Sequence, residues 1–353
     1  MLKLRRTARF LLSYVVLKVN IGAFRVQVTP MPAISLLLQM IRPAAVCLAG
    51  LSVLGGIAGA ETFAASKISF RDITGAVEIK TTSGDEMDIV VRQGGTYRQV
   101  QIEEQDGLVT VVMEPWKEEE GLDCCDRRIT RTFDARATRE TTTGEPLDEE
   151  LFRDYPTIEV SMPYEGDVEF IDARIKLSME RLAGALHLDS CFVYGETSDV
   201  DEAVINIIHG SRLVMGEVKA GLEIDVSGDA DLRVGNAAMV DVDVAGPGDV
   251  ILGDIDGMLD ISIAGSGLVR AARLDGPMTV RIAGSGAVAV KAGTADKLRA
   301  FIDGSGAIFF GGAVTQPELK LYGSSEVRVD QINGRMIRHG GGEVFVNGVR
   351  ADD

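Results

Sequence analysis

One pattern of roughly 19 residues recurs six times between Val226 and Val329, and each copy is centred on a glycine turn. The first glycines of the turns follow one another at nearly equal spacing: Gly228, Gly246, Gly265, Gly284, Gly304 and Gly323. A fixed period in this range is typical of solenoids, in which each repeat buries its apolar face against its neighbours. The repeat therefore constrains the architecture before any local motif is considered.

Apolar residues alternate with polar or small residues on both sides of each turn. Aligned on the turn glycines, they form four apolar columns: Ile224, Val242, Ile261, Val280, Ala300 and Leu319; Val226, Val244, Ile263, Ile282, Ile302 and Leu321; Leu232, Val250, Val269, Val288, Ile308 and Val327; Val234, Leu252, Ala271, Val290, Phe310 and Val329. A period of two indicates strands with one buried face. Because like residues recur at the same place in every copy, the coils must pair in parallel, and the sequence predicts an all-β fold, a parallel β-helix.

The register continues more weakly upstream, through Leu186–Leu188 and back to Val168–Ile171. We expect about nine coils, which at the usual strand spacing stack to a length on the order of 40 Å. The expected organisation is a targeting segment over 1–60, a β segment or cap over 61–113, a charged insertion over 114–156, the β-helix over 157–345 and a tail over 346–353. Residues 61–113 could form a separate small β domain or irregular first coils.

The segment 1–60 contains seven Lys and Arg and no Asp or Glu. Arg42, the apolar run 44–57 and the motif Ala58-Gly59-Ala60 have the order of a secretory signal peptide, with cleavage after Ala60. Met31 or Met40 would be a better-placed start than Met1. A transmembrane anchor is the alternative, although Pro43 and several glycines interrupt the apolar run. We expect export to the periplasm or the cell surface of a bacterium, with no integral span in the processed chain.

Once the segment 1–60 is removed, 29 Lys and Arg face 53 Asp and Glu, which is a net charge of −24. Such a field disfavours nucleic acid as a partner, because neutralising phosphates requires clusters of Lys and Arg. We expect an extracytoplasmic protein or glycan as the partner, and no cofactor.

Three cysteines remain after the expected cleavage site, namely Cys124, Cys125 and Cys191. An oxidising compartment permits a disulfide between one of the vicinal pair and Cys191, which would tie the insertion to the first coils. Free or buried thiols are the alternative. The spacing of the cysteines and histidines matches no zinc site.

The tandem coils ending in Ala/Ser-Gly-Ser-Gly, behind a signal peptide, resemble the head GIN domain family, which is grouped with bacterial autotransporter adhesins. The segments Phe70–Ile79 and Val160–Pro163 also look like related adhesin domains. The resemblance is good over about 220–335 and loose over 160–340. It implies an exported β-solenoid with an adhesive role, and it brings no catalytic or binding residues.

Several parallel β-helices are polysaccharide lyases or hydrolases, so the acidic residues of the early coils could serve in catalysis. In register, Asp225 should stack with Asp243, Glu223 with Asp241 and Asp260, and Asp231 with Asp249. Stacked carboxylates repel one another, which can raise a pKa for acid–base chemistry or recruit a hard cation such as calcium. The simpler interpretation is a solvated acidic face, and Asp225, Asp243, Asp241 and Asp260 are the weak metal-site candidates.

One outward column is basic and apolar instead of acidic, because Arg233, Arg270 and Arg328 alternate there with Ile251, Ala289 and Phe309. Phe301 and Phe309 should both point outward on either side of the Gly304 turn. Exposed aromatic side chains can pack on a sugar or a protein partner, or they can lie under a terminal segment. Phe301, Phe309 and Arg270 are therefore the candidate binding residues.

Two hypotheses follow. The first is a noncatalytic exported module, either adhesin-like or structural, in the cell envelope. The second is a carbohydrate-active enzyme that uses the acidic face. Residues His187, His209 and His339 share no column and show no partner for a catalytic triad.

Overall fold

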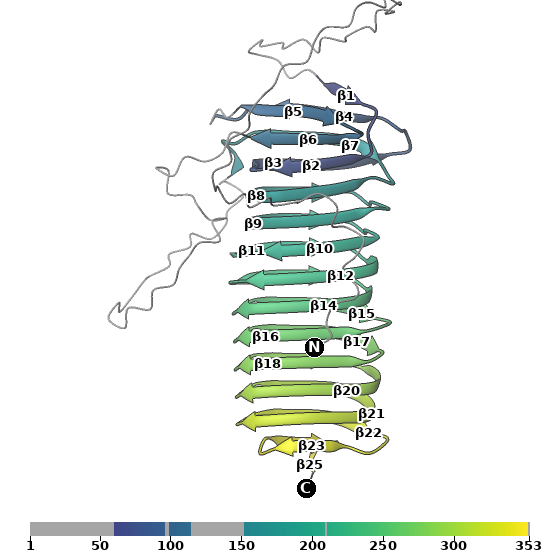
Figure 1. The fold of residues 1–353 in the computed structure, drawn as a ribbon, viewed down its shortest axis with the longest axis vertical. Helices are drawn as coiled ribbons and strands as arrows, with labels where there is room; N and C mark the ends of the chain where they lie inside the picture. The colour runs from purple at the N-terminus through teal and green to yellow at the C-terminus, as the bar shows by residue number, and fades with distance from the viewer. Residues whose placement is uncertain (1–59, 96–98, 114–151, 209, 352–353) are drawn as a thin grey trace, which may run out of the picture. The chain divides into compact units, whose positions relative to one another are not determined.

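The computed structural model describes residues 60–95, 99–113, 152–208 and 210–351. They belong to one compact unit, Gly56–Asp353, and the other unit, Met1–Gly55, lies outside the described residues. The described part is a β-solenoid of about nine turns with coils of roughly 19 residues, as the sequence predicts (Figure 1). Strands β1–β25 join in one continuous hydrogen-bonded sheet.

Each regular coil consists of a strand that approaches a glycine corner and a strand that leaves it. We call the stack of approaching strands the first ladder and the stack of leaving strands the second ladder. The first ladder runs through part of β9 (Ala185–Thr197), β10 (Glu202–Ile207), β12 (Val218–Ser227), β14 (Ala237–Gly246), β16 (Leu259–Gly265), β18 (Met278–Gly284), β20 (Gly293–Gly304), the later part of β21 (Ala307–Gly323) and β23 (Ile337–Gly340). The second ladder runs through the rest of β9, β11 (Ser211–Met215), β13 (Ala230–Val234), β15 (Asp249–Ile255), β17 (Leu268–Asp275), β19 (Ala287–Val290), the start of β21, β22 (Glu326–Ile332) and β24 (Glu343–Val346).

Both ladders are parallel, and their register matches the alignment of the repeats. Gly265 pairs with Gly246 before it and with Gly284 after it, so the corner glycines lie directly above one another. Every residue of the four predicted apolar columns is buried. The core of the solenoid is therefore the stack of these columns, and the intervening side chains project outward.

Antiparallel strands cover the N-terminal end of the parallel stack. The strands before the insertion are β1 (Glu61–Phe63), β2 (Lys67–Arg71), β3 (Thr74–Thr82), β4 (Met87–Arg92), β5 (Val100–Gln105) and β6 (Leu108–Met113), and those after it are β7 (Thr157–Pro163) and β8 (Asp167–Met179). Strands β2 and β3 pair in parallel with β8, whereas β4 pairs antiparallel with β1 and β7, and β5 with β6. The strands of 61–95 and 99–113 are thus hydrogen-bonded into the first coils, and Phe70 stacks on Phe170 with ring centroids 4.7 Å apart.

A hairpin closes the C-terminal end of the second ladder. Strand β25 (Val349–Arg350) turns back antiparallel on β24. Asn347 and Gly348 form the turn with φ angles of 49° and 73°, the left-handed geometry that an Asn-Gly hairpin turn requires. The hairpin occupies backbone groups that a bare edge would expose to other chains.

The predicted insertion, apart from 152–156, lies outside the described residues. Its end packs on the solenoid, because Phe152 is buried and its ring centroid lies 6.1 Å from that of Phe192. The neighbouring Cys191 is fully buried and disulfide-bonded. The chain's other cysteines, Cys47, Cys124 and Cys125, lie outside the described residues, so the pairing of Cys191 with Cys124 or Cys125 stays a prediction.

Candidate functional site

The acidic residues of the early coils stack in the first ladder as the sequence predicts. Asp225 pairs in register with Asp243, and Glu223 is followed in its column by Asp241 and then Asp260. These side chains project outward because each lies between two buried columns. The stacking of like charges about one strand spacing apart is unfavourable, and it must be relieved by solvent or by counter-charges.

Asp241 lies in the middle of this stack. Burial raises the pKa of its carboxyl group, and the neighbouring charges of Asp260, Asp243 and Glu223 raise it further. Arg281 acts in the opposite direction on the pKa of Asp241, and its guanidinium Nη1 lies 2.8 Å from Oδ1 of Asp260. The stack therefore consists of neighbouring carboxylates, and Arg281 offsets part of their charge at the Asp260 end.

No group of three or more metal-ligating side chains lies close enough to hold a metal ion within the part of the chain that the structure describes. The column arrangement explains this finding for Asp225, Asp241, Asp243 and Asp260. Their side chains follow the axis in two parallel rows, whereas a calcium site needs six to eight oxygens converging on one point.

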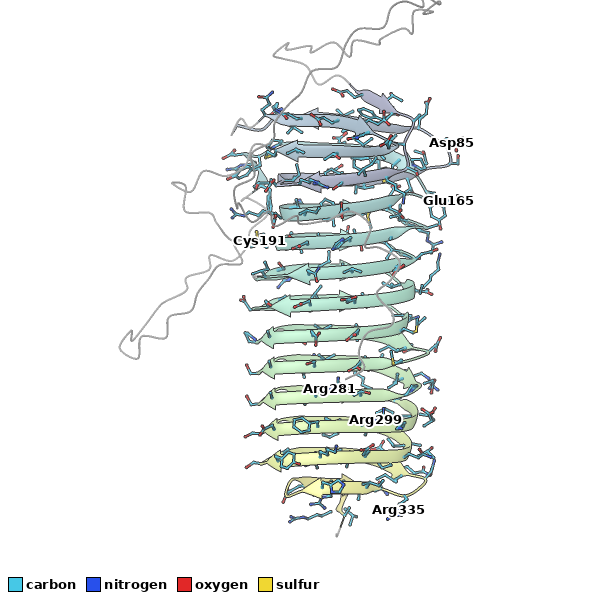
Figure 2. The ribbon with its side chains drawn as sticks, viewed as in Figure 1. Asp85, Glu165, Cys191, Arg281, Arg299 and Arg335 are labelled. Carbon is cyan, nitrogen blue, oxygen red and sulfur yellow. The ribbon has the colours of Figure 1, made fainter. Side chains whose placement is uncertain are left out.

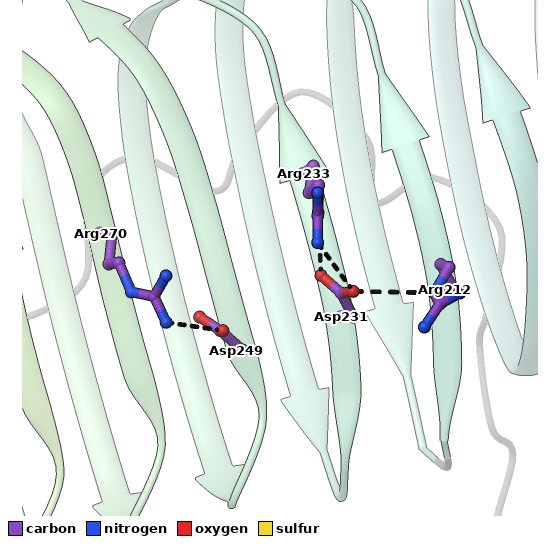
Figure 3. Close-up of polar contacts among 5 residues, drawn as sticks. All are labelled: Arg212, Asp231, Arg233, Asp249 and Arg270. Atoms are coloured by element: carbon purple, nitrogen blue, oxygen red, sulfur yellow. Dashed lines mark hydrogen bonds and ion pairs between the residues drawn. The ribbon is translucent and has the colours of Figure 1, made fainter.

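Acidic and basic residues alternate as ion pairs in the second ladder (Figure 3). Nε of Arg233 lies 3.2 Å from Oδ1 of Asp231, and Nη2 of Arg270 lies 3.0 Å from Oδ2 of Asp249. Asp231 also faces Arg212 of the preceding coil, with Nε and Oδ2 separated by 3.6 Å. The predicted stack of Asp231 on Asp249 is present, and each of these carboxylates has an arginine partner.

Toward the C-terminus, the column of the second ladder that contains the arginines also contains aromatic residues. Arg270, Ala289, Phe309, Arg328 and Phe345 succeed one another in register, and we call these five residues the arginine–aromatic strip. The guanidinium carbon of Arg328 lies 5.5 Å from the ring centroid of Phe309 and 5.1 Å from that of Phe345. Arg328 also pairs with Glu326. The two rings thus hold a cation between them, and Phe309 remains 48% exposed.

Phe301 also points outward, as expected, but it belongs to the first ladder. Its ring centroid lies 5.8 Å from that of Tyr322, with the ring planes tilted by 59°. The structure therefore brings Arg270 and Phe309 onto one ladder and separates Phe301 from them across the Gly304 corner. The sequence did not predict the role of Tyr322, because its contact with Phe301 is diagonal between neighbouring coils. It did not predict Phe345 either, because the last coil is shorter than the repeat.

A polar cluster near the N-terminal end was also not predicted from the sequence. Ser69 Oγ donates a 2.8 Å hydrogen bond to Oε2 of Glu169, and Nδ1 of His187 lies 3.6 Å from Oε1 of the same carboxylate. A serine nucleophile needs the histidine next to its hydroxyl. Here the carboxylate lies between the two, and Ser69 is fully buried, so the contacts are those of a structural hydrogen-bond cluster.

A shallow apolar depression lies on the first ladder beside the acidic stack. Val204, Gly221, Met239 and Met258 line it, with Glu223 and Asp241 at its margin. Met239 and Met258 are 52% and 47% exposed. Among the described residues there is no helix long and apolar enough to span a membrane.

Comparisons with known proteins give likenesses of fold at low identity. No protein-family model matches the chain, and no curated protein does. A "putative adhesin" from Parabacteroides distasonis ATCC 8503 is 13% identical, with 83% of this chain and 98% of that chain covered and a TM-score of 0.32.

A "putative lipid binding protein" from the same organism is 15% identical, with 83% and 97% covered and a TM-score of 0.34. A "putative adhesin" from Parabacteroides merdae ATCC 43184 is 11% identical, with 83% and 97% covered and a TM-score of 0.33. Likenesses of this degree carry no argument about function.

Proposed function

We propose that the protein is a noncatalytic, exported binding module of the bacterial cell envelope, adhesin-like in its use of an extended surface. Its partner is an extracytoplasmic protein or glycan, and the arginine–aromatic strip makes the contact. The signal-like sequence before Glu61 supports export.

The observation that carries the proposal is the run of small and apolar outward side chains along the second ladder from β17 to β21, which only the ion-paired Arg270, Arg273 and Asp275 of β17 interrupt. The outward positions there include the small or apolar Leu268, Ala287, Ala289 and Ala307, with Phe309 exposed at the C-terminal end. The chain as a whole carries a net charge of −17, so this area differs from what surrounds it. Aromatic residues and arginine are enriched in binding surfaces because they bury much area, and the aromatic rings do so with few rotatable bonds.

The ion pairs of the strip also favour a preformed surface. Asp249 holds Arg270 and Glu326 holds Arg328, so both guanidinium groups are oriented before a partner arrives. A partner that covers them therefore loses less ordering entropy than it would with free side chains.

A carbohydrate-active enzyme is the second candidate, and the raised pKa of Asp241 is the observation that favours it. This enzyme would cleave polysaccharide on the first ladder. Asp241→Asn and Asp243→Asn would then abolish turnover, and no turnover of acidic or neutral glycans by the wild-type protein would exclude it.

Cosedimentation with envelope fragments of the producing cell tests the binding function. We expect saturable binding by the wild-type protein and at least about 10-fold weaker binding by Arg270→Ser/Phe309→Ser, since a few central aromatic and arginine residues carry most of the energy of an interface. The control is Arg335→Ser/Val349→Ser, which removes one exposed arginine and one exposed apolar side chain outside the strip.

Fragments treated beforehand with protease or with periodate identify the partner as protein or glycan. Equal binding by the strip variant and the wild type, or loss of binding in the control variant, would contradict the role of the strip.

A further inference from the structure

The outward face of the first ladder changes the sign of its charge halfway along the axis. Its two middle columns run through Glu223, Asp241, Asp260 and Arg299, and through Asp225, Asp243, Arg281 and Lys320. The outward column beside them adds Tyr322 and one carboxylate, Asp303, to the second half. From β9 to β16 the two middle columns contain six carboxylates and no Lys or Arg: Asp189, Glu223, Asp225, Asp241, Asp243 and Asp260. From β18 to β23 they contain Arg281, Arg299 and Lys320 with one carboxylate, Glu318.

The change of sign falls between β16 and β18, where Arg281 of one coil pairs with Asp260 of the coil before it. Figure 2 labels Arg281 and Arg299 on neighbouring strands of the positive half. Both guanidinium groups are exposed, as is Lys320. Lys320 has no ion-pair partner among the residues that the structure describes.

The apolar side chains of this face also differ between its two halves, with a depression in one half and protruding groups in the other. The depression lined by Val204, Met239 and Met258 lies in the acidic half. The positive half instead carries protruding apolar groups, with Phe301, Tyr322 and Ile337 exposed to 42%, 46% and 46%. Five of the eight exposed large hydrophobic side chains in the described chain therefore lie on this one face.

We infer that the first ladder is the interface of an antiparallel homodimer, with a second copy of this chain as its partner. A two-fold axis that runs parallel to the strands in the plane of the interface, level with the gap between β16 and β18, reverses the order of the coils. It sets β14 of one copy opposite β20 of the other, and β12 opposite the later part of β21. An interface of this kind is self-complementary, because each contact occurs twice.

With the strands of the two copies opposed in this way, residues of the same column face one another, and opposite charges meet. Asp241 of β14 faces Arg299 of β20 in the second copy, and Asp225 faces Lys320. At the ends Val204 faces Ile337, so an apolar side chain meets the apolar depression. Glu223 faces Glu318 as the one like-charge pair, and Arg299 lies 3.7 Å from Glu318 in the same copy, which offsets the repulsion.

The area of the face is sufficient for a stable dimer. The eight strand levels from β10 to β23 that face one another span roughly 35 Å, and the strands are about 24 Å wide, which gives about 800 Å² for each copy. Specific interfaces bury about 800 Å² on each partner. The net negative charge opposes association, but at physiological salt charges beyond about 8 Å are screened, whereas pairs in contact are not.

Charge reversal distinguishes this interface from any other. Arg299→Glu/Lys320→Glu leaves Arg281 as the one Lys or Arg of the two columns, and Asp225→Lys/Asp241→Lys makes the acidic half basic or neutral. We expect the wild-type protein to sediment as a dimer at about 50 μM, and each reversed variant to dimerise at least about 100-fold more weakly, since juxtaposed like charges replace attractive pairs. An equimolar mixture of the two variants should form a heterodimer, because the acidic face of one then meets the basic face of the other.

Analytical ultracentrifugation of the purified protein and its variants gives the result. Lys291→Glu/Arg350→Glu is the control, since it makes the same change in net charge as Arg299→Glu/Lys320→Glu outside the first ladder and should leave the dimer intact. A wild-type monomer at this concentration, a dimer that survives reversal, or a mixture that stays monomeric would overturn the inference. Circular dichroism of each variant verifies that the coils are retained.

Discussion

At the scale of single residues, the corner glycines are the positions where the chain has least choice. Gly284 has a φ of 129°, in a region that only glycine adopts without strain. A Cβ atom at this position would lie 2.4 Å from the carbonyl oxygen of Gly265, the equivalent glycine one coil earlier. The glycine is thus required twice, once by its own backbone angle and once by the spacing between coils.

The substitution Gly284→Ala should lower the free energy of unfolding by about 3 kcal/mol, because the new residue must adopt a strained backbone and displace a neighbouring carbonyl. Gly221→Ala is the matched control, since a Cβ there meets nothing within 4 Å. The measurement is the midpoint of urea unfolding for both variants. Equal midpoints would mean that the corner relaxes without cost.

Asp241 is a surface residue whose ionisation lowers the stability of the folded protein. Because its pKa is raised in the folded protein, the folded state holds this proton more tightly than the unfolded chain does. Ionisation of Asp241 therefore costs stability at neutral pH, and this cost disappears as the pH falls through the raised pKa toward the ordinary value of 3.8.

Asp241→Asn should therefore raise the melting temperature of the monomer by about 1 °C at pH 7, when it is measured at a concentration too low for dimerisation, because solvent screening keeps the effect of an exposed charge small. The gain should shrink by pH 4.5, since the wild-type carboxyl is then partly protonated. Asp303→Asn is the control, because its neighbours in register are Ala283 and Tyr322. A gain that is independent of pH would contradict the charge-repulsion account.

At the scale of the strands, the parts built from repeats were predictable and the parts without repeats were not. The buried columns, the corners and the register of Asp225 on Asp243 follow from a period that every coil shares. The antiparallel strands β1, β4 and β5 break that period, and short alternating runs do not reveal which edge they will cover.

The candidate site was predictable only in part, for the same physical reason. Register fixes which side chains share a column, so Arg270 and Phe309 could be aligned beforehand. Contacts such as Asp260 with Arg281 and Phe301 with Tyr322 run diagonally between coils. Their formation depends on rotamers and on competing neighbours, which a sequence alignment does not contain.

The disulfide at Cys191 links a regular strand to a part of the chain outside the repeat. We expect Cys191 to pair with Cys124 or Cys125, which would hold the charged insertion against the coil where Phe152 packs on Phe192. Reduction should then lower the free energy of unfolding by about 2–4 kcal/mol. Peptide mapping by mass spectrometry without reduction measures the pairing, and a Cys191 peptide carrying a free thiol or joined to Cys47 would refute it.

At the scale of the molecule, the solenoid is a sum of similar coils, each stabilised mainly by its two neighbours. Removing a whole coil should therefore preserve the architecture, whereas removing part of a coil should not. This property also explains how the outward columns can differ so much between the two halves of the molecule while the core remains uniform.

Deletion of residues 266–284 joins Gly265 directly to Ser285 and keeps every buried column in register. We expect a folded protein with a lower midpoint of urea unfolding, because one set of coil contacts is lost. Deletion of residues 266–275 removes about half a coil and should prevent cooperative folding, since the buried and exposed faces are then out of phase. Circular dichroism during urea titration distinguishes the two, and equal behaviour of both deletions would contradict a modular lattice.

We propose that the lattice of coils presents the second ladder to a partner outside the cytoplasm. The most direct measurement places a photo-crosslinking amino acid at Ala289, between Arg270 and Phe309 of the arginine–aromatic strip, and at Thr315, an exposed position outside both ladders. Illumination of intact cells should give an envelope adduct from position 289 and none from position 315. The same adducts from both positions, or no adduct at position 289, would contradict the account.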